Sequence, residues 1–168
     1  GALFLTDSEF SRQEILDFFR LDEHRVVAIP LGVDRRYQPI STENSRPILS
    51  RFGLLPDRYT LSVSTIEPRK NINRLITAYR TLPNNLRLAY PLVLAGNEGW
   101  NSTAIHERIE QGTAEGWLKY LSYVDEADLP ALYSGARVFA CVSLYEGFGL
   151  PVLEAMAAGT PVISASVA

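Results

Sequence analysis

The amino-acid sequence predicts an α/β fold in which a doubly wound parallel sheet lies between two layers of helices. Short apolar segments alternate with segments of helical pattern, as in chains whose parallel strands are joined by crossover helices. The apolar segments are almost continuously hydrophobic rather than alternating, which is typical of strands buried on both faces. Six segments have this strand pattern: 25–29, 59–66, 92–96, 119–124, 137–143 and 161–165.

The segments between these strands have the spacing of amphipathic helices. In residues 71–82 the apolar side chains recur every three or four positions, and Pro83 ends the pattern because proline cannot continue a helix. Residues 101–111, 126–134 and 150–158 fill the next three gaps. Strands and helices of these lengths, in alternation, predict the layered architecture.

The first forty residues are organised differently. Residues 3–5 form a further candidate strand, and residues 11–19 form a candidate helix in which Ser11 and Glu14 have the spacing of a capping box. Residues 30–41 are polar and contain one glycine and two prolines. This composition fits either a domain boundary or a long surface loop.

The end of the sequence predicts that the chain is truncated. The last residues follow directly after an apolar strand. A parallel strand requires a crossover connection, and an uncovered sheet edge is prone to pair with other chains. We therefore expect this sequence to be a piece of a longer protein.

Composition excludes several classes of function. The chain has 168 residues, of which 46% are hydrophobic, and 16 Lys and Arg against 19 Asp and Glu give a net charge of −3. An acidic balance argues against a nucleic-acid binder, whose surface would be basic. The single cysteine, Cys141, cannot form an internal disulfide. With no signal segment and no apolar run of about 18 residues, we expect a cytoplasmic protein without a transmembrane segment.

The first of two charged loops follows the strand at residues 59–66. Open parallel α/β sheets bind ligands beyond the carboxyl ends of their strands, so this loop is well placed for a site. Arg69 and Lys70 precede a helix, where each cation is unfavourable by about 0.3–1 kcal/mol unless an anion is bound. Taken alone, this loop is better explained as a solvated turn, in which Glu67 neutralises the cations and Asn71 caps the helix, because exposed charges are normal at such turns.

The second loop follows the strand at residues 137–143 and leads into a helix. Gly147 and Gly149 allow the backbone to approach a ligand closely. Free N–H groups at the start of the helix then form a ready phosphate site. Glu146 and Glu154 are eight residues apart, and a carboxylate can accept hydrogen bonds from two neighbouring ribose hydroxyls. Either glutamate alone fits an ordinary exposed acid, whereas the whole pattern predicts a binding site.

These residues resemble the E-x₇-E signature of the retaining glycosyltransferases of family four, which have the GT-B fold. Residues 64–71 resemble the phosphate-binding loop of a mannosyltransferase-like branch, and residues 31–34 resemble the family's interdomain hinge. The resemblance implies the Rossmann-like C-terminal half of a GT-B fold, truncated at its C-terminus. It divides the chain into a remnant of the N-terminal domain (1–29), an interdomain linker (30–45) and an incomplete donor-binding domain (46–168).

The resemblance also implies roles for individual residues. Glu146 would bind the transferred sugar and support charge at its anomeric centre, and Glu154 would bind the ribose. Lys70 would neutralise the diphosphate leaving group. Many relatives have an arginine where this chain has Ser64, and Arg69 is the candidate that would replace it. The remaining donor-binding candidates are Gly96, Val124, Gly147, Phe148, Gly149 and Leu150.

The activity implied is transfer of a sugar from a nucleotide-diphosphate donor to a glycan or lipid-linked acceptor, with retention of anomeric configuration. The branch indicates mannose, and GDP-mannose is the first donor to test. The sequence has no D-x-D pair and no His/Cys cluster at ligand spacing, so we expect neither a metal nor another cofactor. A missing N-terminal domain would bind the acceptor, and the fragment alone would be inactive. Peripheral membrane contact of the parent protein is compatible with this reading.

Two alternatives belong to other classes of protein. A non-catalytic nucleotide-sugar-binding module would have the same fold, but the paired glutamates argue against it. A dinucleotide-dependent oxidoreductase would carry G-x-G-x-x-G after its first strand, and residues 65–70 contain no glycine. A purely structural module would leave both charged loops unexplained.

Overall fold

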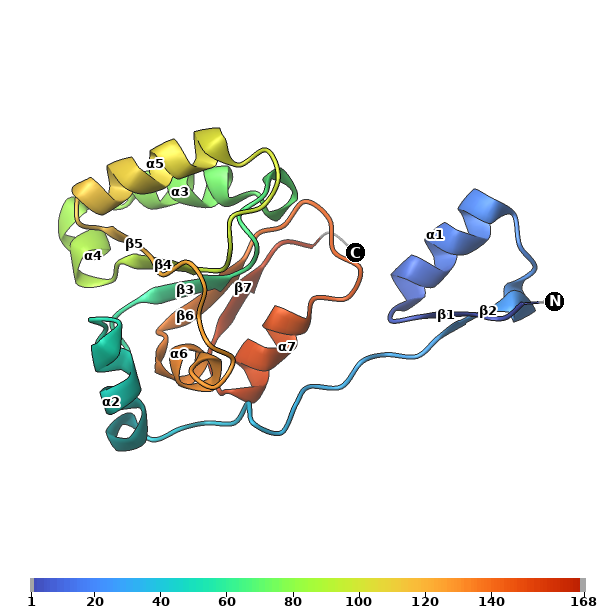
Figure 1. Ribbon diagram of the computed structural model, residues 1–168, viewed down its shortest axis with the longest axis horizontal. Coiled ribbons are helices and arrows are strands. Elements are labelled where there is room, and N and C mark those ends of the chain that lie inside the picture. The colour runs from blue at the N-terminus through green and yellow to red at the C-terminus, as the bar shows by residue number, and fades with distance from the viewer. Residues whose placement is uncertain (1, 167–168) are drawn as a thin grey trace.

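The computed structural model describes residues 2–166, and most of them form a three-layer α/β domain (Figure 1). Its sheet has five strands in the order β5-β4-β3-β6-β7, and every neighbouring pair is parallel. The strands are β3 (Thr60–Val63), β4 (Leu92–Ala95), β5 (Leu118–Tyr120), β6 (Val138–Cys141) and β7 (Val162–Ser164). The predicted doubly wound parallel sheet is confirmed.

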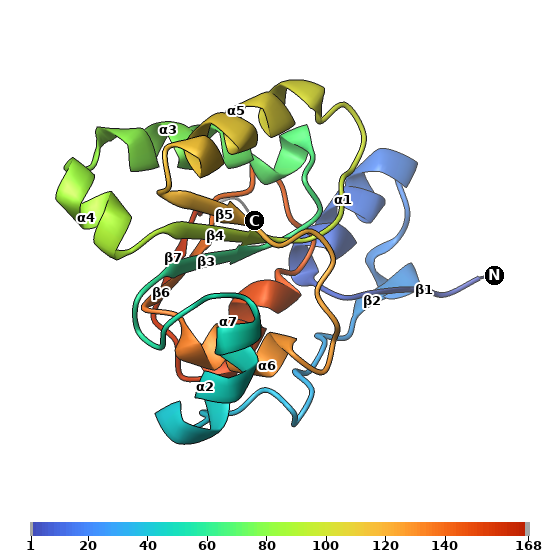
Figure 2. The same cartoon turned by 60° about the vertical axis from the view of Figure 1, so that its left-hand side comes forward.

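Helices cover both faces of this sheet. Figures 1 and 2 show α3 and α5 on one face and α2, α6 and α7 on the other. The helices are α2 (Thr42–Arg51), α3 (Ile72–Thr81), α4 (Asn84–Ala89), α5 (Thr103–Ala114), α6 (Leu129–Gly135) and α7 (Leu150–Ala157). The sequence pattern predicted α3, α5, α6 and α7, and it missed α2 and α4.

Burial of the central strands on both faces explains their continuous apolar sequences. Along β4, Leu92 and Leu94 belong to the core beneath α3 and α5, whereas Val93 and Ala95 belong to the core beneath α6 and α7. Successive side chains of a strand point to opposite faces of its sheet. Each position of β4 therefore has to be apolar, because each meets a helical layer.

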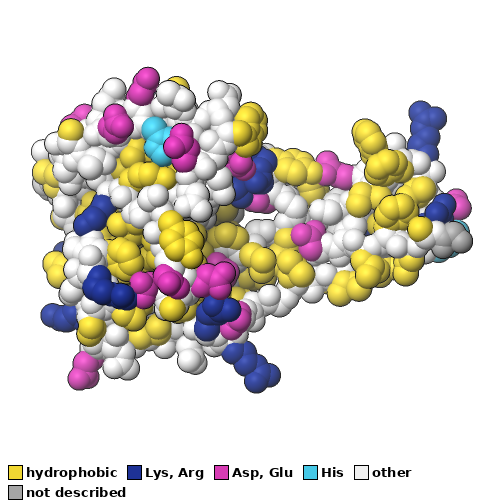
Figure 3. All heavy atoms as spheres, in the orientation of Figure 1, with side chains coloured by type: hydrophobic (Ala, Val, Ile, Leu, Met, Phe, Trp, Pro, Cys, Tyr) yellow, Lys and Arg dark blue, Asp and Glu magenta, His cyan; other side chains and the backbone are white. Residues whose placement is uncertain are grey.

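The N-terminal residues form a small separate unit. Strands β1 (Phe4–Thr6) and β2 (Val26–Ala28) pair in parallel, and α1 (Glu9–Phe19) connects them. Figure 3 shows that hydrophobic side chains gather on the surface of this unit. The exposed apolar side chains of the unit and the adjoining residues are Leu3, Phe4, Leu5, Phe18, Phe19, Val27 and Ile29.

One expectation for the N-terminal region needs correction. The cap of α1 is Ser8, whose side chain accepts a hydrogen bond from the Ser11 backbone N–H at 3.0 Å. The predicted capping box at Ser11 is therefore wrong, because an earlier serine already occupies the capping position. Residues 29–41 contain neither helix nor strand. Helix α2 then begins at Thr42, within the predicted linker.

Gly96 allows the loop after β4 to lie directly against the loop after β3. Its φ is +140°, and a Cβ at this position would lie 2.0 Å from the Ser64 carbonyl oxygen. Gly96→Ala is expected to destabilise the protein by about 1–3 kcal/mol, since both the backbone angle and the contact become strained.

Urea unfolding of Gly96→Ala and Gly32→Ala checks this expectation. A Cβ at Gly32 would have no atom within 4 Å, so that variant should unfold at nearly the wild-type urea concentration. Equal unfolding midpoints for both variants would contradict the steric argument.

Candidate functional site

The site lies where the order of the strands reverses. From β3 the chain moves outward to β4 and β5, and it then returns to place β6 on the other side of β3. The loops that follow β3 and β6 leave the same edge of the sheet at this reversal. In open α/β sheets such a switch point is the usual place for a ligand. One loop carries Arg69 and Lys70, and the other carries Glu146, as predicted.

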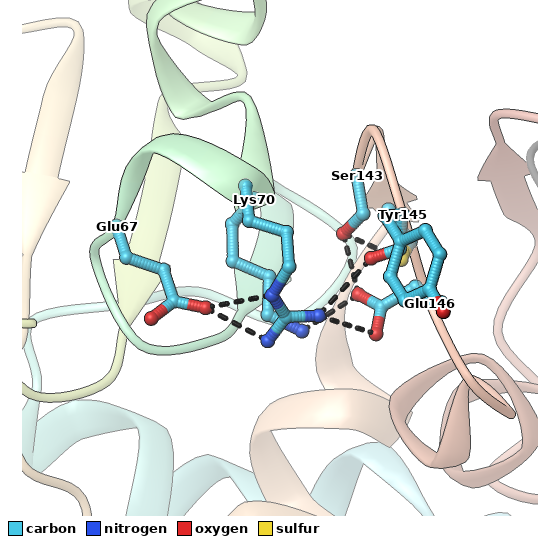
Figure 4. Close-up of polar contacts among 7 residues, drawn as sticks. Glu67, Lys70, Ser143, Tyr145 and Glu146 are labelled. Carbon is cyan, nitrogen blue, oxygen red and sulfur yellow. Dashed lines mark hydrogen bonds and ion pairs between the residues drawn. The ribbon is translucent and has the colours of Figure 1, made fainter. Parts of the chain in front are cut away.

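The candidate residues of the two loops contact one another directly. Lys70 Nζ donates to Glu146 Oε1 at 2.6 Å, and Arg69 Nη1 donates to Glu146 Oε2 at 3.2 Å. In Figure 4, Glu146 and Ser143 come from one loop and face Lys70 and Glu67 of the other. Residues 76 positions apart in the sequence, Lys70 and Glu146, are thus direct neighbours.

Glu146 is held as a carboxylate. The Ser143 hydroxyl donates to Glu146 Oε1 at 2.5 Å, in addition to the bonds from the two cations. Partial burial alone would raise the pKa of Glu146, but hydrogen bonds from Lys70 and Ser143 and the nearby positive charges hold that pKa below its ordinary value. The group is therefore ionised at neutral pH and cannot act as a proton donor there.

Asn71 does not cap the following helix, contrary to the solvated-turn interpretation. It adopts a left-handed conformation with φ at +57°, and no side-chain capping bond is formed. Its Nδ2 instead donates to the Val142 carbonyl oxygen at 3.0 Å. Asn71 therefore ties the loop after β3 to the residue that follows β6.

The positive end of α7 faces the same region. Gly149 precedes this helix with φ at +91°, and within residues 2–166 no side chain caps its N-terminus. A cavity of about 200 Å³ lies there and is lined by Ser143, Glu146, Phe148 and Gly149, among others. Backbone N–H groups and the dipole of a helix N-terminus both favour an anion. Leu150 is the first residue of α7, so its N–H belongs to this set.

Glu154 lies farther along α7, beside two buried tyrosines. The Tyr133 hydroxyl donates to Glu154 Oε2 at 2.7 Å. Burial and the Glu154 charge raise the pKa of Tyr133, and they raise the pKa of Tyr37 to about 12. Both phenols therefore stay protonated at neutral pH. Val124 is buried in the same core cluster as these tyrosines.

The N-terminal unit contacts the loop that carries Glu146. Tyr145 packs edge-on against Phe10, with ring centroids 5.5 Å apart, and its hydroxyl donates to Glu14. A Cβ added at Gly147 would meet the Ser11 hydroxyl at 3.3 Å. Gly147 therefore lies against this unit.

Sequence reasoning missed three of the four residues that hold the site together, and it expected the fourth, Glu67, to neutralise the cations beside it. Glu67 binds Arg69, Ser143 binds Glu146, and Tyr133 binds Glu154, while Tyr37 packs on Tyr133 with ring centroids 5.6 Å apart. Ser143 lies at the end of a predicted strand, three residues before Glu146, and this position was the available signal for it. The partners of Tyr133 and Tyr37 are distant in sequence.

Within residues 2–166 no group of three or more His, Cys, Asp and Glu side chains is arranged to hold a metal ion. In the same part of the chain, every helix is too short or too polar to cross a membrane.

Comparison with known proteins identifies the family. Residues 50–168 match the family described as "Glycosyl transferases group 1". The chain belongs to this family. It is 46% identical over 167 residues to the O-antigen chain mannosyltransferase B of Escherichia coli, covering 99% of this chain and 44% of that protein. It is 34% identical over 164 residues to the serotype-specific mannosyltransferase WbdA of the same organism, covering 95% of this chain and 20% of that protein.

Solved structures support the assignment of the fold. HepE of Anabaena, solved in complex with UDP and glucose, superposes with a TM-score of 0.84 at 22% identity and covers 99% of this chain and 45% of that chain. The predicted GT-B class and the likeness to mannosyltransferases are thus confirmed. The group 1 chain spans less than half the length of these relatives.

Proposed function

We propose that this group 1 chain is the donor-binding part of a longer enzyme that transfers mannose, with retention, from a nucleotide-diphosphate donor to a glycan or lipid-linked acceptor. The observation that carries the proposal is the meeting of Lys70, Glu146 and the N-terminus of α7 at the switch point of the sheet. Mannose is supported by the names of the relatives. We place the enzyme in the cytoplasm, at the membrane surface when its acceptor is lipid-linked.

The proposed role of these groups follows from the charges that develop during transfer. As the nucleoside diphosphate leaves, negative charge grows on its phosphate and positive charge grows on the sugar. Lys70 and the N–H groups at the start of α7 would stabilise the phosphate, and the Glu146 carboxylate would stabilise the sugar. Preorganised charges of this kind are effective because they need no rearrangement during the reaction. Glu154 would hold the ribose by accepting hydrogen bonds from its hydroxyls.

This arrangement needs no metal ion in our proposal. The ammonium of Lys70 and the helix dipole supply the positive charge that a bound cation supplies in other sites. Transfer by the full-length enzyme is therefore expected to continue in EDTA. The donor is a substrate, and no further cofactor is proposed.

A thermal-shift panel on the full-length enzyme tests the donor, using GDP, UDP, ADP and their sugars. A nucleotide present at 100 times its dissociation constant stabilises the native state by about 2.7 kcal/mol. We expect GDP and GDP-mannose to raise the melting temperature most, and GDP-mannose to support turnover. A shift without turnover on any acceptor would favour a non-catalytic binding module. If no nucleotide shifted the melting temperature, the proposed function would be rejected.

A further inference from the structure

Arg69 and Lys70 are adjacent cations, but the structure gives them different surroundings. We propose that Arg69 is a positioning residue that fixes the loop carrying Glu146, and that Lys70 is the cation that meets the diphosphate. This inference rests on the proposed function, because it divides two roles within that site.

All the donor nitrogens of the Arg69 guanidinium are engaged within the protein. Nε and Nη2 bind Glu67 Oε1 at 3.0 and 2.7 Å. Nη1 donates to the Tyr145 carbonyl oxygen at 3.0 Å and to Glu146 Oε2 at 3.2 Å. The backbone carbonyl of Arg69 also accepts a bond from the Leu144 N–H at 2.8 Å. Arg69 therefore bridges the two loops through both its side chain and its backbone.

Glu67 is the fixed end of this bridge. It is 8% exposed, and the preceding Ile66 is 1% exposed in the core beneath α3 and α5. The Ile66 carbonyl accepts a bond from the Gly99 N–H at 3.0 Å, which fastens this segment to the loop after β4. A planar guanidinium held at two nitrogens by a carboxylate has a defined orientation. Glu67 thus sets the direction in which Arg69 reaches toward Glu146.

Lys70 is held in a different manner. Its ammonium binds Glu146 at 2.6 Å, and Lys70 lines a small cavity together with Ser143, Glu146 and Pro151. Pro151 belongs to the first turn of α7, so Lys70 faces the same space as the N-terminus of that helix. An ammonium on a flexible stem has three rotatable donors. It can turn from Glu146 to an arriving phosphate without breaking the bridge between the loops.

Substitutions at the two cations should therefore have different kinetic effects. Arg69→Lys keeps the charge but cannot bind Glu67, the Tyr145 carbonyl and Glu146 together. We expect kcat to fall by about 10- to 100-fold, since a displacement of about 1 Å at a catalytic group has effects of this size. The dissociation constant for GDP should change by less than about threefold. Lys70→Ala should instead weaken GDP binding by about 10- to 100-fold.

A second variant tests the bridge from its other end. Glu67→Gln should lower kcat as Arg69→Lys does and leave GDP binding nearly unchanged. The double variant should be little worse than either single variant, because both changes break the same link. Arg137→Lys is the matched control, since Arg137 pairs with Asp57 at the surface; its kcat and GDP affinity should equal those of the wild type.

The measurements are steady-state kinetics, GDP titration calorimetry and amide hydrogen exchange on the full-length enzyme. Exchange in residues 142–149 should be faster in Arg69→Lys and Glu67→Gln than in the wild type, but not in Lys70→Ala. The inference is overturned if Arg69→Lys weakens GDP binding as much as Lys70→Ala, or if exchange in 142–149 is unchanged. Absence of turnover by the wild-type enzyme with any nucleotide sugar would refute the proposed function, while the exchange result would still decide the role of Arg69.

Discussion

Replacing Glu146 by glutamine is expected to lower kcat of the full-length enzyme by on the order of 10²- to 10³-fold. Glutamine keeps the shape of the side chain but removes the negative charge that would stabilise the developing sugar cation. The affinity for GDP is expected to rise, because Lys70 loses the carboxylate that binds it at 2.6 Å. Kinetics with GDP-mannose and GDP titration calorimetry measure the two effects.

Glu107→Gln is the control for this substitution, because Glu107 lies exposed on α5. It should leave both kcat and GDP affinity at wild-type values. Undiminished transfer by Glu146→Gln would show that the carboxylate has no part in the reaction. That outcome would leave Lys70 and α7 as a binding site only.

Trp117→Ala is expected to have the largest effect on stability, about 3–5 kcal/mol. The Trp117 side chain is fully buried, stacks on Tyr79 with ring centroids 6.0 Å apart, and donates from its indole N–H to Glu115 at 2.7 Å. Truncation would remove all these contacts and leave a large cavity beside β4 and β5. Urea unfolding followed by circular dichroism measures the change in the free energy of unfolding.

Trp100 provides the matched control, because it is 65% exposed. Trp100→Ala should change the free energy of unfolding by less than about 0.5 kcal/mol. A loss of similar size in both variants would contradict the burial argument. The sequence alone does not rank the two tryptophans by burial, since Tyr79, which packs on Trp117, is distant in the chain.

The strands were predictable because burial on both faces requires a continuous run of apolar residues. Such a run can be recognised without knowing which strands pair with it. The ends of the strands were less predictable. Residues 59–66 formed one apolar run, but β3 ends at Val63, and Ile66 pairs instead with Glu98 in an isolated bridge. The apolar run is longer than the strand because Ile66, which lies beyond the end of β3, is still buried in the core.

Two helices escaped prediction for identifiable reasons. Helix α2 contains Pro47 and few apolar residues, so its sequence shows little helical pattern. It is stabilised by a cap at Ser41 and by packing of Leu49 in the core beneath α6 and α7. Helix α4 has six residues, too few to display a period. In α2, tertiary packing outweighs the local signal, whereas α4 has no buried residue.

The site was predictable at the level of loops but not of contacts. Strand ends, glycines and paired charges indicated which two loops would carry chemistry, and the strand order brings these loops together. The sequence could not show that Arg69 links Glu67 to Glu146, or that Tyr133 donates to Glu154. These pairings depend on side-chain directions that only the folded chain defines.

A structure of the full-length enzyme with bound GDP tests the central claim most directly. The account predicts a diphosphate whose oxygens lie within hydrogen-bonding distance of Lys70 Nζ and of the backbone N–H groups at Gly149 and Leu150, with the ribose beside Glu154. A nucleotide bound elsewhere on the enzyme, with Lys70 still paired only to Glu146, would contradict it.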